Sequence, residues 1–581
     1  MSTEPIVPLD PNWPVRPLAE IHAELTAPGA KFETELADIR GVQTRVWKNA
    51  PPTLRVLTQM VRAYGPREFT IYEDERVTYE AHYRAVCHLA HKLTEMGVGK
   101  GDRVALAMRN LPEWPVIFFA GVSIGAILVP LNAWWTGGEL EYALKDSGAK
   151  LLVVDGERHE RLKHCYDKLP ALERVIVSRA KGEVEPPVSR LEVLIGNPRD
   201  WADLPDIGLP EVTILPDDEA TIFYTSGTTG SPKGALGTHR NFVTNILSSG
   251  FSSSRTLLRR GEIPPAAPDH KTTLLVIPLF HVTACSAAMM TMIAAGGTMI
   301  FMKRWDPVLA MALIQREKIN MTGGVPTIAW QLLEHPERAN YDLSSLEAIT
   351  YGGAPSAPEL VKRIFEEFGA LPGNGWGMTE TTATVTTHSG EDYLNRPTSA
   401  GPPVAVAELK IMDVEATHEL PPGEVGEVWA KGPMVVKEYW NKPEASAETF
   451  VDGWVRTGDL GRIDEEGFLY IVDRAKDIII RGGENIYSSE VEDVMYAHPA
   501  VTDCALIGVP HRSLGEEPVA VVHLAPGTST SEVELQEWVR ARLAGFKVPV
   551  AIRFVPETLP RNANGKILKK DLKAMFAEAA V

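Results

Sequence analysis

"YTSGTTGSPKG", residues 224–234, combines glycines, hydroxyl side chains and one cation, Lys233, in a single short loop. Glycines let the backbone turn its N–H groups toward an anion, and hydroxyls add further donors. The stretch is not a Walker-type P-loop, because that motif needs Gly, four residues and then Gly-Lys-Ser/Thr. Counting from Gly227 puts Pro232 where the second glycine should stand, and Gly234 rather than a hydroxyl residue follows the lysine. The loop therefore indicates a phosphate site of another kind.

The residues on either side of the loop predict regular structure. "ATIFYT" (220–225) is rich in β-branched and aromatic residues and predicts a buried strand, while "THRNFVTNILSS" (238–249) has apolar residues at helical spacing. Strand and helix patterns alternate from about residue 70 to 400, which predicts an α/β fold with a mostly parallel sheet. After residue 400 short strands and glycine turns predict a small β-rich subdomain, followed by an independent α+β domain.

Composition excludes several classes of function. The chain has 581 residues and a formal net charge of -18, which argues against a nucleic-acid partner. Its four cysteines lie far apart and form no CxxC pair, so a zinc site is not expected. The same spacing indicates a protein of a reducing compartment. The first residues lack the basic region of a signal peptide. We therefore expect a cytoplasmic protein.

Two uncharged apolar stretches, 114–135 and 281–302, are long enough to cross a bilayer. Gly125 and Pro130 interrupt the first, and the Gly296-Gly297 pair interrupts the second. We interpret each as a core helix, a turn and a short buried strand, which is what a parallel sheet covered on both faces requires. No transmembrane segment is expected.

Six further motifs follow the loop in a fixed order: "PLFHVTA" (278–284), "YGGAP" (351–355), "GWGMTE" (375–380), "TGDL" (457–460), "VDRAKD" (472–477) and "PRNANGK" (560–566). Together they resemble the adenylate-forming superfamily of acyl-CoA synthetases, peptide-synthetase adenylation domains and beetle luciferases. The resemblance extends from about residue 50 to 575. It implies that a carboxylate attacks the α-phosphorus of ATP to give acyl-adenylate and pyrophosphate, and that a thiol then displaces AMP.

The resemblance implies ATP-binding roles for many residues. The loop holds the triphosphate, "GGAP" lines the adenine, and Trp376 stacks on it where the family more often has tyrosine. Asp459 accepts hydrogen bonds from both ribose hydroxyls, as an ionised carboxylate can, and Arg474 helps to hold the ribose. The full predicted set is Thr225, Ser226, Gly227, Thr228, Thr229, Gly230, Lys233, Gly352, Gly353, Ala354, Pro355, Trp376, Gly377, Met378, Asp459 and Arg474.

Four residues receive catalytic roles from the same resemblance. Lys566 bridges the carboxylate and the α-phosphate as charge develops, and Thr379 contacts the α-phosphate. Glu380 binds magnesium, a hard cation suited to carboxylate and phosphate oxygens. His281 borders and gates the acyl pocket. Four of the predicted site residues also have a structural explanation when taken alone: Lys566 could lie on a solvated face, Asp459 in a turn, Arg474 in a surface ion pair, and His281 in the core.

"RGGENIYSSEVE" (481–492) resembles the form found in acyl-CoA ligases, so CoA is the expected acceptor. Gly483 would lie against the pantetheine arm, and Ser488 stands where the family usually has proline.

Lys476 aligns with the hinge about which the small domain rotates. The expected division is an N-terminal extended arm (1–50), an N-terminal adenylation domain of layered α/β subdomains (51–472), a hinge (473–477) and a small mobile C-terminal domain (478–581).

The residues expected to line the acyl pocket are mostly small or apolar, which predicts a neutral, hydrophobic tail on the substrate: His281, Val282, Ala284, Cys285, Val325, Pro326 and Thr327. Medium- to long-chain fatty acids are therefore the first expected substrates, with aryl or arylalkyl acids second. The alternatives are another acceptor, namely an amine, a carrier protein or a luciferase-like oxidation, or a non-catalytic homologue. The last should lack Lys566, Glu380 or Asp459, yet all three are present. The sequence leaves peripheral membrane contact and homodimerisation open.

Overall fold

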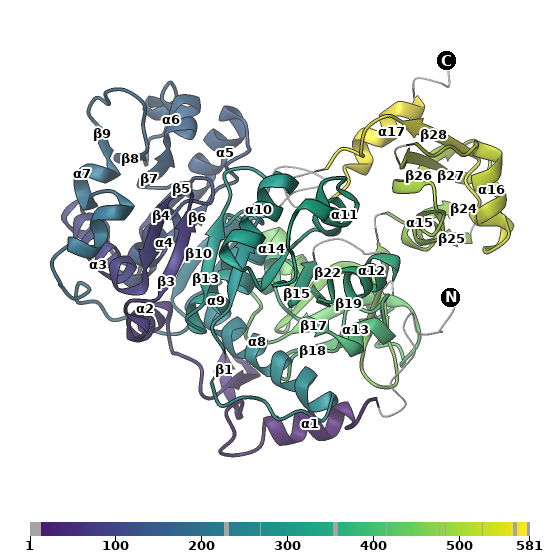
Figure 1. The fold of residues 1–581 in the computed structure, drawn as a ribbon, viewed down its shortest axis with the longest axis horizontal. Helices are drawn as coiled ribbons and strands as arrows, with labels where there is room; N and C mark the ends of the chain where they lie inside the picture. The colour runs from purple at the N-terminus through teal and green to yellow at the C-terminus, as the bar shows by residue number, and fades with distance from the viewer. Residues whose placement is uncertain are drawn as a thin grey trace.

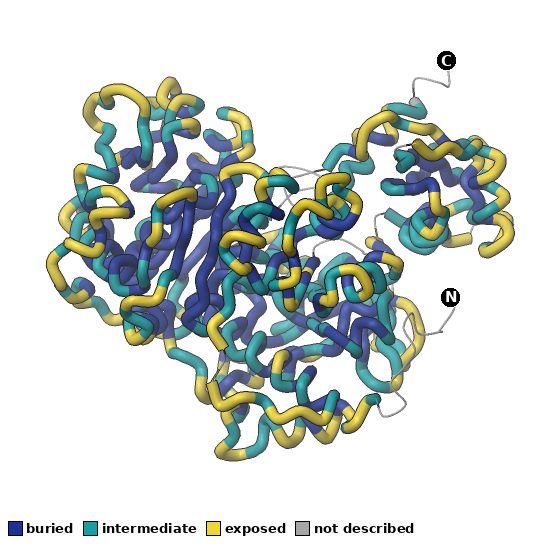
Figure 2. Tube along the Cα trace, in the orientation of Figure 1, coloured by how far each residue is buried: buried dark blue, intermediate teal, exposed yellow. Residues whose placement is uncertain are grey.

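The computed structural model describes residues 13–225, 232–267, 269–352, 358–413, 415–475, 477–482, 484–525, 527–561 and 566–577. Within them, two eight-stranded, largely parallel sheets form the centre of the molecule (Figure 1). In Figure 2 their strands appear as the dark blue, buried interior. The predicted α/β class, with a large N-terminal part and a small C-terminal one, is confirmed.

The first sheet carries the phosphate loop at one side. Its strands, in spatial order, are β20 (Glu438–Tyr439), β11 (Gly234–Thr238), β10 (Glu219–Tyr224), β6 (Ile127–Pro130), β5 (Arg103–Ala107), β7 (Leu151–Asp155), β8 (Arg174–Ser178) and β9 (Val188–Arg190). The order of the second sheet is β17 (Thr386–Ser389), β16 (Leu371–Trp376), β15 (Ala348–Gly352), β14 (Met321–Gly324), β12 (Thr272–Leu275), β13 (Thr298–Phe301), β3 (Glu68–Tyr72) and β4 (Glu75–Thr78). In this sheet, the strand that leads into the "GWGMTE" motif is β16, next to the edge strand β17.

A layer of apolar helices lies between the two sheets. Phe118 and Phe242 belong to one buried cluster with Val104 of the first sheet and Phe69 of the second. The helices of this layer are α2 (Leu54–Met60), α3 (Tyr79–Glu95), α4 (Glu113–Ser123), α7 (Leu191–Ile195), α8 (His239–Arg259), the π-helix η4 (Thr283–Met289) and α9 (Met290–Ala294). The outer faces are covered by α5 (Gly137–Ser147) and α6 (Gly156–Leu162) on the first sheet, and by α10 (Pro307–Glu317), α11 (Pro326–Glu334), α12 (Pro358–Phe368) and α13 (Glu391–Asn395) on the second.

The two uncharged stretches fold as predicted. Residues 114–135 supply α4 and then β6, and residues 281–302 supply η4, α9 and then β13. Every residue of α4 is buried, which explains why its sequence is apolar on all sides between Glu113 and Ser123. None of the helices in the described part of the chain combines the length and the apolar character that a membrane crossing needs.

Two smaller sheets follow. One contains β18 (Glu408–Met412), β19 (Gly426–Lys431), β21 (Phe450–Val451), β22 (Trp454–Ile463) and β23 (Leu469–Arg474), with α14 (Pro443–Thr449) beside it. The other contains β24 (Ile479–Arg481), β25 (Glu484–Ile486), β26 (Val501–His511), β27 (Gly515–Leu524) and β28 (Ala551–Val555). Helices α15 (Ser488–Tyr496), α16 (Glu532–Arg540) and α17 (Lys569–Ala577) pack on the latter sheet. The C-terminal unit so formed stands to one side, near α11 (Figure 1).

The prediction of an extended arm over residues 1–50 is wrong for much of the described part. Residues Leu18–Leu25 form α1, and Thr34–Ile39 (β1) pairs antiparallel with Val42–Trp47 (β2). The short patterns explain this: Leu18 and Ile21 are buried at helical spacing, and the Arg40-Gly41 turn adopts the positive φ angles that a tight hairpin requires. Trp47 then packs on Phe251 of α8, so the segment is part of the core.

Candidate functional site

Two hydrogen bonds close the base of the phosphate loop. The Thr225 N–H donates to the Lys233 carbonyl at 2.8 Å, and the Lys233 N–H donates to Thr225 Oγ1 at 3.2 Å. The predicted strand before the loop is confirmed as β10 and the predicted helix as α8, but a strand that the sequence did not predict, β11, lies between the loop and the helix. Strand β11 comes first and pairs antiparallel with β10, because the hairpin returns the chain along the sheet before α8 begins.

A buried carboxylate, Glu380, lies at the end of the "GWGMTE" motif in a short 3₁₀ turn. Its Oε1 accepts a 2.5 Å hydrogen bond from the Tyr439 hydroxyl, and the Lys233 ammonium lies 4.6 Å from the centre of the Tyr439 ring. Burial raises the pKa of Glu380, while the tyrosine bond and the charges of Lys233 and Arg474 act in the opposite direction. The pKa of Tyr439 is also raised by burial, so its hydroxyl keeps its proton and donates.

The backbone after Glu380 is strained. Thr382 and Ala383 are both in positive-φ conformations, at 50° and 91°, which cost about 1–3 kcal/mol each for residues other than glycine. Surrounding contacts hold this geometry: the Thr382 hydroxyl donates to the Met434 carbonyl, and Asn245 of α8 donates to the Thr382 carbonyl at 2.5 Å. Strain of this kind, held by neighbouring elements, fixes the direction in which the Glu380 turn faces.

A second buried carboxylate, Asp459, lies on β22 opposite Arg474 of β23. Its Oδ2 accepts a 2.8 Å hydrogen bond from the Trp376 indole N–H, and its Oδ1 pairs with the Arg474 guanidinium at 3.2 Å. Each carboxylate oxygen has two lone pairs, so both retain an acceptor site. The hydrogen bond to Asp459 thus fixes the edge of the Trp376 ring and leaves the two faces of the ring for packing.

The predicted acyl wall is buried and apolar around His281. Val282, Ala284 and Cys285 are buried, and the last two belong to the π-helix η4, a rare form that is frequent at functional sites. The His281 ring contacts Phe280 edge to face, and its Nε2 has no hydrogen-bond partner among the described residues. Burial lowers the pKa of His281 to about 3, so the ring is neutral at physiological pH.

The junction between the two units is tied by hydrogen bonds across residue 476. Asp473 of β23 accepts from the backbone N–H of Ser488 and, at 2.9 Å, from its hydroxyl. The Ser489 hydroxyl donates to the Val472 carbonyl. Proline, usual for the family at position 488, has no N–H, so serine supplies a donor that the usual residue could not.

Arg561, the last described residue before Lys566, lines a hollow of about 360 Å³ between the two units. Its N-terminal wall includes Pro326 and Thr327, and its C-terminal wall includes Asp503 and Arg561. Arg561 pairs with Asp503 at 2.6 Å and forms a β-bridge with Ile567, directly after Lys566. The structure thus brings the base of the Lys566 loop to the same hollow as two predicted acyl-pocket residues.

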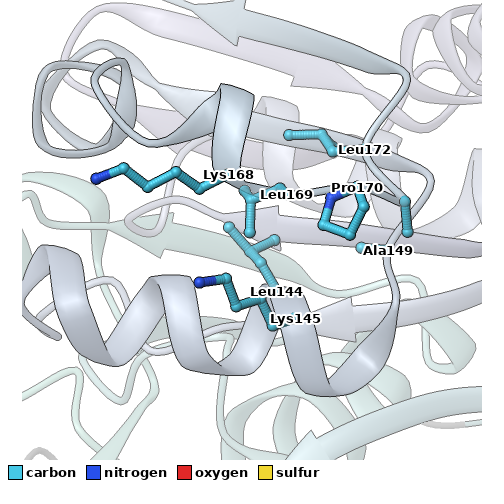
Figure 3. A pocket seen from close by; sticks show the side chains of 8 residues that line it. Leu144, Lys145, Ala149, Lys168, Leu169, Pro170 and Leu172 are labelled. Atoms are coloured by element: carbon cyan, nitrogen blue, oxygen red, sulfur yellow. The ribbon is translucent and has the colours of Figure 1, made fainter.

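Another hollow, of about 290 Å³, lies beside α5 and is shown in Figure 3. Leu144, Pro170 and Leu172 give it apolar walls, and the ammonium groups of Lys145 and Lys168 point away from the Pro170 end. No predicted site residue lines it, so it is separate from the candidate site.

Several predicted site residues lie outside the described part of the chain. They are Ser226, Gly227, Thr228, Thr229, Gly230, Gly353, Ala354, Pro355, Lys476 and Gly483. Among the described members, the structure brings together two groups: Lys233 near Glu380, and Trp376 and Arg474 at Asp459. Trp376, Gly377 and Met378 lead directly from the second group to the Glu380 turn.

Comparison with known proteins agrees with this geometry. Residues 57–440 match the family model described as AMP-binding enzyme, and residues 490–566 match the AMP-binding enzyme C-terminal domain. A feruloyl-CoA synthase from an Amycolatopsis species is 36% identical over 86% of this chain and 94% of its own length. A long-chain-fatty-acid–CoA ligase from Bacillus subtilis is 34% identical over 89% of this chain and 93% of its own. The crystal structure of an anthranilate CoA ligase in complex with anthranoyl-AMP has a TM-score of 0.81 and 25% identity, and the match covers 91% of this chain and 98% of that one.

The chain therefore belongs to the AMP-binding enzyme family, that is, to the adenylate-forming superfamily. Within it the protein is of the acyl-CoA synthetase type, an AMP-forming acid–CoA ligase.

The donor set suits magnesium. Glu380 offers one buried carboxylate whose Oε2 is not the oxygen bonded to Tyr439, next to the base of a loop expected to hold phosphates. Magnesium usually takes one or two protein carboxylates together with substrate phosphates, so a cage made only of protein ligands is not needed. In the described residues, no three His, Cys, Asp or Glu side chains gather in one such cage.

The sequence analysis missed Tyr439 and Asn245. Tyr439 is 59 residues from Glu380 in the chain, and Asn245 is 137 from Thr382. No local spacing pattern connects such distant positions. Only the fold relates them to the phosphate-loop hairpin: Tyr439 belongs to β20, which pairs with β11, and Asn245 belongs to α8, which follows β11.

We expect Gly377→Ala to abolish ATP binding. A Cβ at this position would lie 1.3 Å from the Ala383 carbonyl oxygen, so the strained turn that carries Glu380 would have to move. Gly138→Ala is the matched control, because a Cβ there meets nothing within 4 Å. Calorimetric titration with ATP measures the effect. Wild-type affinity in a folded Gly377→Ala protein would contradict the geometry.

We also expect His281→Gln to change the rate of adenylation by the same factor from about pH 6 to about pH 8. The pKa of His281 is lowered to about 3 by burial, well below its ordinary value of about 6.5, so the ring does not titrate in this range. Adenylation rates of both proteins across the pH range give the ratio. A ratio that changes around neutrality would show that His281 ionises in this range, which would contradict the effect of burial on its pKa.

Proposed function

We propose that this protein activates a monocarboxylic acid with a neutral, apolar tail and transfers it to CoA. The observation that carries the proposal is the wall around His281: a ring held neutral by burial and the apolar Val282, Ala284 and Cys285. A second carboxylate on the substrate would be buried there without a partner, which costs several kcal/mol. Such a pocket favours an acid whose only charge is the reacting carboxylate.

The first half-reaction joins two anions, so the site must neutralise charge and fix orientation. We assign Lys233 and the loop hydroxyls to the triphosphate, and Asp459 and Arg474 to the ribose. Glu380 would hold magnesium, which supplies positive charge between the phosphates. Thr379 would contact the α-phosphate and Lys566 would bridge it to the attacking carboxylate. The two buried carboxylates with their donors support these roles.

The second half-reaction needs a different arrangement of the C-terminal unit. Lys566 and Gly483 belong to this unit, and we assign the first to adenylation and the second to the pantetheine arm. Lys476 would act as the hinge between domains 51–472 and 478–581, because a few residues at an element boundary can absorb the change in φ and ψ. The Asp473–Ser488 hydrogen bonds form a defined contact between the two units across this position.

We expect one of two acid classes as substrate. Medium- to long-chain fatty acids come first, and the similarity to a long-chain-fatty-acid–CoA ligase supports them. Aryl or arylalkyl acids come second, supported by the similarity to a feruloyl-CoA synthase and to an anthranilate CoA ligase. Both classes have a neutral tail, so the wall around His281 admits either.

A panel of acids assayed for AMP release, with and without CoA, tests the proposal. We expect octanoate, palmitate or ferulate to give CoA-dependent AMP release, and malonate and succinylbenzoate to give none above background. Pyrophosphate exchange into ATP in the same samples shows whether adenylation occurs without CoA.

Preferred use of a dicarboxylate would contradict the neutral wall. AMP release that depends on an amine rather than CoA would contradict the acceptor.

A further inference from the structure

One tyrosine contacts both the expected phosphate lysine and the expected metal carboxylate. Tyr439 and Glu380 are both buried, with 5% and 6% of their surfaces exposed. The Tyr439 hydroxyl donates to Glu380 Oε1 at 2.5 Å, and the Lys233 ammonium lies 4.6 Å from the centre of the same ring. None of the motifs that define the family resemblance above includes this residue.

The fold holds Tyr439 firmly at this place. Strand β20 extends the first sheet, and Tyr439 lies opposite Ala235 of β11, which directly follows the phosphate loop. The Tyr439 N–H donates to the Ser446 hydroxyl at 2.9 Å. The preceding segment is bound to the Glu380 turn through the Val436 N–H, which donates to the Glu380 carbonyl at 2.9 Å. The ring and the carboxylate therefore have one fixed relative position.

This position has a direct consequence for the carboxylate. With Oε1 bonded to the phenol, Glu380 keeps one side-chain orientation and presents Oε2 as the oxygen for a cation. Groups that orient a metal-binding side chain in this way typically change metal affinity by about 10–100-fold when they are removed. Because the donor is neutral, it fixes the carboxylate without cancelling the negative charge that attracts the cation.

We propose that Tyr439 is a positioning residue whose hydroxyl orients Glu380 toward the magnesium ion of bound ATP. The proposal rests on the function proposed above, in which Glu380 is the magnesium ligand. The aromatic ring has a separate role, because it contacts Lys233 whether or not a hydroxyl is present.

Tyr439→Phe isolates the hydroxyl, since phenylalanine keeps the ring beneath Lys233. The experiment is calorimetric titration with ATP, in excess magnesium and in EDTA, with no carboxylic acid and no CoA, so that no turnover occurs. We expect Tyr439→Phe to reduce the gain in ATP affinity caused by magnesium by about 10-fold. Its ATP affinity in EDTA should match that of the wild type.

Two further variants make the test specific. Tyr470→Phe is the matched control: it removes a partly buried hydroxyl that donates to Asp464 at 3.2 Å, and it should leave both affinities unchanged. Glu380→Gln should lose the magnesium-dependent gain. Adding Tyr439→Phe to Glu380→Gln should then cause no further loss, because the two residues act through one interaction.

The outcomes separate the two claims. If Glu380→Gln loses the magnesium-dependent gain but Tyr439→Phe keeps it, the positioning role is wrong and the proposed function stands. If Tyr439→Phe loses affinity equally with and without magnesium, the hydroxyl supports the nucleotide site in general and the proposal is also wrong. If Glu380→Gln keeps the full gain, the magnesium assignment fails, and the role of Tyr439 fails with it.

Discussion

The site depends on two carboxylates that are buried yet must stay charged. Removing an ionised carboxylate from water costs several kcal/mol unless donors replace the lost hydration. Here each carboxylate receives a neutral aromatic donor on one oxygen: the Tyr439 hydroxyl on Glu380, and the Trp376 indole on Asp459. The Lys233 ammonium lies over the ring of Tyr439, which bonds to Glu380. Arg474 lies opposite Asp459 on the adjacent strand β23. In the proposed function, Glu380 uses its remaining acceptor capacity for a magnesium ion and Asp459 for a pair of ribose hydroxyls.

Much of the fold could be predicted from the sequence because its signals are local. The apolar stretches 114–135 and 281–302 each became a helix and a buried strand, as glycine and proline positions indicated. Strand β11 was missed because "GALGT" carries two glycines and little strand propensity, so its pairing with β10 and β20 makes it a strand. The N-terminal hairpin was missed for a related reason, because its proline-rich start obscured the pattern that follows.

The residues of the candidate site also divide into those that a local motif marks and those that only the three-dimensional fold brings together. Glu380 and Asp459 could be identified because each lies in a short motif. Tyr439 and Asn245 could not, because their roles come from strands and helices that meet only in three dimensions. Trp376 was recognised, but its hydrogen bond to Asp459 was not, since 83 residues separate the two. Ser488 was noted as a departure from the usual proline, and in the structure its hydroxyl donates a hydrogen bond to Asp473.

The central claim is that two half-reactions use different residues of the C-terminal unit at one site. The most direct test follows Lys566→Ala through each half-reaction separately, with Lys570→Ala, an exposed lysine of α17, as the control. The account predicts that Lys566→Ala slows acyl-adenylate formation by roughly 10²–10³, the cost of one preorganised contact to developing charge. It also predicts near-normal conversion of supplied acyl-adenylate to the CoA thioester. Equal slowing of both steps would contradict the account.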